Sequence, residues 1–120
     1  MTCEVFIGQL FLARDVAHSV HLSTRSYAKH VALNNFYDEV IELTDKFAEA
    51  YQGRYGLIGP VKRVVTKDPE SIIPFLQASM ERLTEMRYKV CDKADTPLQN
   101  IIDEIIGLYL TTLYKLKFLA

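Results

Sequence analysis

The chain has 120 residues, of which 49% are hydrophobic and 24% are charged. This composition is that of one globular domain with a sizeable core, and it excludes a disordered chain. Five glycines and four prolines are few for an all-β protein, which needs a turn roughly every ten residues. The formal net charge of −1 gives no indication of a nucleic-acid or anionic membrane partner.

The two cysteines, Cys3 and Cys91, lie far apart and lack the spacing of a metal site or a redox motif. We expect free thiols in a reducing compartment, with a disulfide as the less favoured alternative. No basic segment precedes an apolar stretch at the N-terminus, and no apolar run reaches the roughly 18 residues of a membrane span. The sequence therefore predicts a cytoplasmic protein without a membrane partner, in a cell or an infected cell.

The first predicted helix runs from about Glu4 to Leu22 and carries two apolar stripes on different sides. At about 100° per residue, the first stripe consists of Phe6, Leu10, Ala13, Ala17 and Val20. The second stripe consists of Ile7, Phe11 and Leu22. We expect the first stripe to face the core of the chain. The second stripe is expected to pack against another subunit.

The second predicted helix, from about Tyr27 to Gln52, has the strongest periodicity in the chain. Its apolar residues are three and four positions apart throughout: Leu33, Phe36, Val40, Leu43, Phe47 and Tyr51. We expect Gly53 to end this helix as its C-terminal cap. Residues 54–67 then form the one long connection, which would carry the chain back along a bundle.

The third predicted helix starts near Asp68, with a proline and an acidic residue directly behind it, and runs to about Cys91. The fourth begins at Thr96 and is apolar nearly all round, so we expect another subunit to cover its outer side. The sequence thus predicts an all-α fold, a four-helix bundle in a single domain over residues 1–120, that assembles into a homo-oligomer.

Histidines and carboxylates are the residues whose arrangement indicates chemistry. His18, His21 and His30 all lie near the first loop. Four carboxylates of the second helix form one stripe directed away from its apolar face: Asp38, Glu42, Asp45 and Glu49. Such a stripe is usually a solvated surface. Because Lys46 is the only basic residue among these acids, helical ion pairs do not explain the stripe, and a bound cation is the alternative. Imidazole with carboxylate suits iron, manganese or zinc better than calcium.

The intervals between four of these residues are similar to those of a known family. His30 follows His18 by twelve positions, Asp45 follows by fifteen more, and Glu49 by four more. This pattern resembles the ferroxidase segment of the Dps family, the small ferritin-like proteins of starved bacteria. The likeness covers about half of the chain. Two further segments, 26–30 and 51–56, look like segments of small phage-encoded proteins. Those proteins look like shortened relatives of Dps.

The resemblance implies a ferritin-like bundle with a metal bound between two subunits, the histidines coming from one and the acids from the other. Fe(II) would bind there, be oxidised by peroxide or oxygen, and be stored as ferric oxide, so the chain would be a ferroxidase with iron as its metal. His21 is an alternative to His18 as the first ligand. With three loop residues deleted, His21, Tyr27 and His30 also fit the spacing of the family.

Other features depart from the family. The chain is short, has no tryptophan, and carries Asn34 where many relatives have an aspartate. It also lacks a lysine-rich N-terminal tail, which argues against DNA binding. The alternative function is therefore a non-enzymatic helical oligomer that has lost iron chemistry, either a phage or host-interaction scaffold or a protein that sequesters a small ligand. Neither a nucleophile motif nor a glycine-rich phosphate loop is present.

Overall fold

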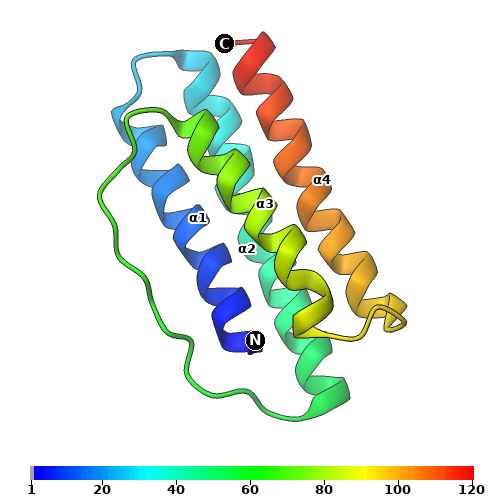
Figure 1. The fold of residues 1–120 in the computed structure, drawn as a ribbon. Helices are drawn as coiled ribbons and strands as arrows, with labels where there is room; N and C mark the ends of the chain where they lie inside the picture. The colour runs from blue at the N-terminus through cyan, green and yellow to red at the C-terminus, as the bar shows by residue number, and fades with distance from the viewer. Residues whose placement is uncertain (1) are drawn as a thin grey trace.

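The computed structural model describes residues 2–120, and these form four α-helices around one core. The helices are α1 Cys3–Ser23, α2 Tyr27–Tyr55, α3 Ile72–Val90 and α4 Thr96–Phe118. Their axes lie side by side (Figure 1), and α1 and α4 each pack against both α2 and α3. As a result α1 lies diagonally opposite α4. The predicted all-α four-helix bundle is confirmed.

The predicted long connection between the second and third helices is also confirmed. Residues 56–71 leave the end of α2 and run the length of the bundle to the start of α3 at the opposite end (Figure 1). Because of this crossover, α2 and α3 point in the same direction, while α1 and α4 both point the other way. Ferritin-like bundles also have one long crossover, although connectivity alone does not define a function.

The connection crosses α1 closely, and this overturns one prediction. A Cβ atom added at Gly8 would lie 2.8 Å from the carbonyl oxygen of Lys62, so only a glycine fits at this crossing. Ile7 is buried within the chain, and Phe11 packs partly against the core. The prediction that Ile7, Phe11 and Leu22 form a subunit interface is therefore wrong for Ile7, whereas Phe11 is partly exposed and Leu22 is well exposed.

Two helix ends differ from the predicted positions. Gly53 lies inside α2, which continues to Tyr55 and ends at Gly56, whose φ of 97° a glycine adopts without strain. Likewise α3 begins after its N-cap residue Ser71 rather than near Asp68. The Asp68 carboxylate instead accepts a hydrogen bond from the hydroxyl of Ser19. This side chain therefore fastens the end of the connection to α1 and does not cap α3.

Tyr109 of α4 occupies the centre of the core. Its side chain is fully buried, and its hydroxyl shares a 2.8 Å hydrogen bond with the buried hydroxyl of Ser79 on α3. The Phe36 ring of α2 meets the Tyr109 ring edge-on, with centroids 5.0 Å apart. Burial raises the pKa of the Tyr109 phenol, so the hydroxyl stays protonated and can remain in this bond. One side chain thus joins three helices.

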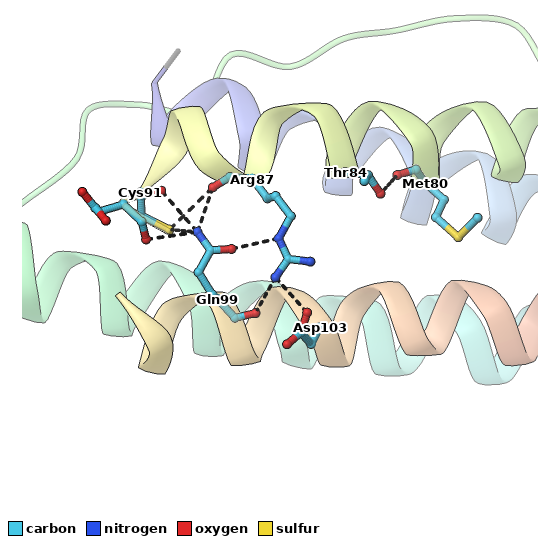
Figure 2. Close-up of polar contacts among 7 residues, drawn as sticks. Met80, Thr84, Arg87, Cys91, Gln99 and Asp103 are labelled. Atoms are coloured by element: carbon cyan, nitrogen blue, oxygen red, sulfur yellow. Dashed lines mark hydrogen bonds and ion pairs between the residues drawn. The ribbon is translucent and has the colours of Figure 1, made fainter. Parts of the chain in front are cut away.

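A polar cluster fastens the end of α3 to α4 (Figure 2). The Gln99 side-chain amide donates to the carbonyl oxygens of Arg87, at 3.0 Å, and Cys91, at 3.2 Å. In return, the Arg87 guanidinium donates to the Gln99 side-chain oxygen at 2.9 Å and to the Asp103 carboxylate at 2.8 Å. The last carbonyl groups of a helix have no partner within the helix, so Gln99 supplies a cap from a neighbouring element.

Both cysteines are buried and free, as expected for thiols that do not form a disulfide with each other. Burial raises the pKa of the Cys3 thiol to about 12, and it also raises the pKa of Cys91. Since the thiolate is the reactive form, both side chains are expected to react slowly with thiol reagents at neutral pH.

The outer side of α4 carries exposed apolar residues in its C-terminal half, as the sequence predicts, although charged residues are exposed on the same side. Leu110, Tyr114 and Phe118 are 53%, 54% and 73% exposed, whereas the opposite side of the same helix is buried in the core. Within residues 2–120, none of the helices has the length and apolar content needed to cross a membrane.

Candidate functional site

The three histidines meet at the end of the bundle where α1 passes into α2. The rings of His21 and His30 are stacked, with centroids 3.7 Å apart and an angle of 17° between their planes. The His18 ring centroid lies 6.1 Å from that of His21. The short turn between the two helices therefore brings together the residues that the sequence places on either side of it.

Reciprocal hydrogen bonds hold two of these rings. His21 Nδ1 lies 2.6 Å from the carbonyl oxygen of His30, and His30 Nδ1 lies 2.8 Å from the carbonyl oxygen of His21. A carbonyl oxygen can only accept, so each Nδ1 must carry the hydrogen, and each neutral ring keeps the lone pair on Nε2. Histidines that bind metals through Nε2 commonly have this Nδ1–H···O=C support.

Sequence reasoning missed Tyr37, which completes the cluster. Its ring stacks on that of His18 with centroids 4.2 Å apart and meets the ring of His21 edge-on at 5.2 Å. The Tyr37 hydroxyl donates to the side-chain oxygen of Asn34 at 2.8 Å. Tyr37 lies two helical turns after His30, so it shares a face with it, and this spacing was the available signal. His21 is almost completely buried in the cluster, while His18 and His30 are half-buried.

The four carboxylates of the predicted stripe all point into solvent. Asp38 accepts a 3.2 Å hydrogen bond from Asn34. Lys46 pairs at 3.1 Å with Glu104 of α4 and not with the acids of its own helix. The orientation away from the core agrees with the helical spacing in the sequence.

The structure does not bring the acids to the histidines within one chain. Asp45 follows His30 by fifteen residues on the same helix, which corresponds to about 22 Å along the axis. Within the described part of the chain, no group of three His, Cys, Asp or Glu side chains lies close enough to hold one metal ion. A complete set of the predicted ligands therefore requires a second copy of the chain.

A surface depression lies away from this cluster. It has a volume of about 470 Å³ and lies between α1, α2 and the connection, lined by Phe11, Arg14, Asp15, Ile41, Arg63 and Val64. The side chains of Arg14 and Asp15 form an ion pair at 3.1 Å, which neutralises one of the two guanidinium groups. Arg14 and Arg63 come together only because the connection crosses α1, so this depression could not be predicted from the sequence.

These features define a small all-α protein, a four-helix bundle with one long crossover and a histidine cluster at one end. Residues 21–116 match the family described as "Family of unknown function (DUF5856)", and the chain belongs to this family. It is 30% identical over 115 residues to an uncharacterized 14.6 kDa protein from the mobD–ri intergenic region of Enterobacteria phage T4, which covers 95% of this chain and 87% of that protein. No solved structure matches the chain.

The phage relative agrees with the expected similarity to phage-encoded proteins. Neither the family description nor the relative refers to Dps or to a ferritin, so the resemblance to Dps remains a hypothesis that rests on the intervals between His18, His30, Asp45 and Glu49.

Proposed function

We propose that the chain is a subunit of a homo-oligomer that binds Fe(II) between two copies, with imidazole ligands from one copy and Asp45 and Glu49 from the other. The observation that carries the proposal is the reciprocal hydrogen bonding of His21 and His30, which fixes both Nδ1 atoms as donors and leaves Nε2 of His30 free to bind a metal. Imidazole nitrogen together with carboxylate oxygen is a suitable donor set for Fe(II).

The exposure of the side chains supports a site shared between copies. Asp45 and Glu49 face solvent, where a neighbouring subunit can reach them. Of the histidines, His18 and His30 are more accessible than His21, and these two also fit the intervals of the Dps family. We therefore assign the ligand roles to His18 and His30 and a supporting role to His21. The resemblance to Dps implies that iron bound there would be oxidised by peroxide or oxygen. The relative in phage T4 supports a role in the cytoplasm of an infected bacterium.

An anaerobic Fe(II) titration followed by calorimetry tests this proposal. The unaltered chain is expected to bind Fe(II) saturably, and Asp45→Ala/Glu49→Ala is expected to bind at least about 100-fold more weakly, since even the loss of groups that only support ligands costs about 10–100-fold. Addition of peroxide should then produce ferric absorbance only in the unaltered chain. The matched control is Asp38→Ala/Glu42→Ala, which removes two exposed acids of the same stripe and should bind normally.

Two results would contradict the proposal: no binding by the unaltered chain, or equal binding by Asp45→Ala/Glu49→Ala. Either one would favour the second candidate function, a non-enzymatic helical assembly subunit. The observation that favours this candidate is the exposed apolar side of α4, because a contiguous apolar surface on a small protein commonly marks an interface.

A further inference from the structure

We infer that two copies of the chain pair through the outer ridge of α4, antiparallel and related by a two-fold axis that passes between Leu110 and Thr111. The α4 ridge consists of the outward-facing residues Asp103, Glu104, Gly107, Leu110, Thr111, Tyr114, Lys117 and Phe118. The inference rests on the homo-oligomer of the proposed function, but it does not depend on iron.

The α4 ridge has the spacing of a helix-packing seam. Its members are three or four residues apart, so they form one stripe along the helix. The rings of Tyr114 and Phe118 lie 6.1 Å apart and contact each other, yet both are more than half exposed. The buried side of α4 already supplies the core with Tyr109 and its neighbours, so the apolar residues of the ridge are additional to those that the bundle uses.

Gly107 is the second observation, and nothing within the chain explains it. A Cβ atom added at this position would meet no atom within 4 Å, so packing within the chain does not require a glycine. Glycine in the middle of a helix is less favourable than alanine. In the antiparallel pair, Gly107 lies opposite Tyr114 of the partner subunit, because the two positions are equally far from the axis. A residue without a side chain gives an aromatic ring room to lie against the helix.

The charges of the α4 ridge select the antiparallel direction. Asp103 and Glu104 lie toward the N-terminal end of the ridge, and Lys117 lies at its C-terminal end. About the same axis, Glu104 lies opposite Lys117 of the partner subunit. A parallel pair would instead place like charges side by side. Glu104 already pairs with Lys46, but half of its side chain remains exposed and can accept from a second cation.

This interface leaves the histidine cluster free. The cluster joins α1 and α2, and α4 lies diagonally across the bundle from α1. The α4 ridge can therefore pair without covering the histidines, and the pairing can be tested in the absence of metal.

Cysteine cross-linking tests the pairing in a buffer that contains a metal chelator. In Leu110→Cys the new thiols of the two copies lie beside the axis and are expected to form a covalent dimer on mild oxidation. In Phe118→Cys the two thiols are separated by about 22 Å along the helices, and this variant should stay monomeric on a denaturing gel. The unaltered chain, with its buried Cys3 and Cys91, is the blank. Equal cross-linking of both variants, or of neither, would overturn the antiparallel pair.

A second pair of variants tests the same contact in solution. By light scattering the unaltered chain should have at least twice the chain mass of 13.8 kDa. Tyr114→Ser and Gly107→Arg should weaken association at least tenfold while the helical circular dichroism is retained, because neither site is in the core. If the unaltered chain is monomeric, the inference is overturned. This also holds if the monomer instead binds anionic lipid vesicles through the α4 ridge. Loss of iron binding alone would not affect any of these readouts.

Discussion

Tyr109→Ala is expected to lower the free energy of unfolding by about 3–5 kcal/mol, the range observed when a large buried ring is removed. Tyr109 is fully buried and contacts both α2, through Phe36, and α3, through Ser79. Its removal therefore leaves a cavity where three helices meet, and the surrounding helices cannot collapse to fill it. Urea denaturation followed by circular dichroism measures the change.

The matched variants separate the ring from the hydroxyl. Tyr109→Phe keeps the ring but leaves the buried Ser79 hydroxyl without its partner, which should cost about 1–3 kcal/mol. Tyr109→Phe combined with Ser79→Ala removes both polar groups and should recover most of that loss. If Tyr109→Ala were as stable as Tyr109→Phe, the central position of this ring would be contradicted.

Gln99→Leu is expected to lower the free energy of unfolding by about 2–4 kcal/mol, although leucine is apolar and similar in size. The side-chain NH₂ group of Gln99 donates hydrogen bonds to carbonyl groups at the end of α3 (Figure 2). The side-chain oxygen of Gln99 accepts a hydrogen bond from the Arg87 guanidinium. Without Gln99, carbonyl groups at the end of α3 and part of the largely buried Arg87 guanidinium lose their partners. Urea denaturation again gives the free energy.

The control for this prediction is the neighbouring Asn100→Ala, which alters an exposed side chain and should change stability by less than about 0.5 kcal/mol. Hydrogen exchange adds a local readout, since Gln99→Leu should accelerate exchange of the last amides of α3 more than those of α1. Equal stability of Gln99→Leu and Asn100→Ala would show that the cap contributes nothing.

The helices were predictable because long segments carry a consistent period. In α2 the apolar residues recur every three or four positions, and its core residues Leu33, Phe36, Val40 and Phe47 are all completely buried. The ends were less predictable because several residues give the same signal. Gly53 and Gly56 are both possible caps, and only the backbone conformation distinguishes them. Asp68 has the features of an N-cap, but a distant contact with Ser19 decides its role.

The candidate site was predictable only in outline. The histidines flank a short turn, so their proximity follows from the sequence, whereas the stacking of His21 on His30 depends on the path of that turn. Gln99 could have been recognised as a polar residue on the buried side of an apolar helix, because it lies three residues before Ile102. The hydrogen-bond partners of Gln99 at the end of α3 could not be predicted, because they depend on how α3 and α4 pack against each other.

Complementation between two defective variants is the most direct test of an iron site shared by two subunits. One variant is Asp45→Ala/Glu49→Ala. The other is His18→Asn/His30→Asn, in which the asparagine amide can replace the Nδ1 donor but not the Nε2 ligand. Each alone should bind no Fe(II). After the two are refolded together, about a quarter of the wild-type capacity should return, because half of randomly formed pairs are mixed and each mixed pair restores one of two sites. No recovery in verified mixed oligomers would contradict a site formed between subunits.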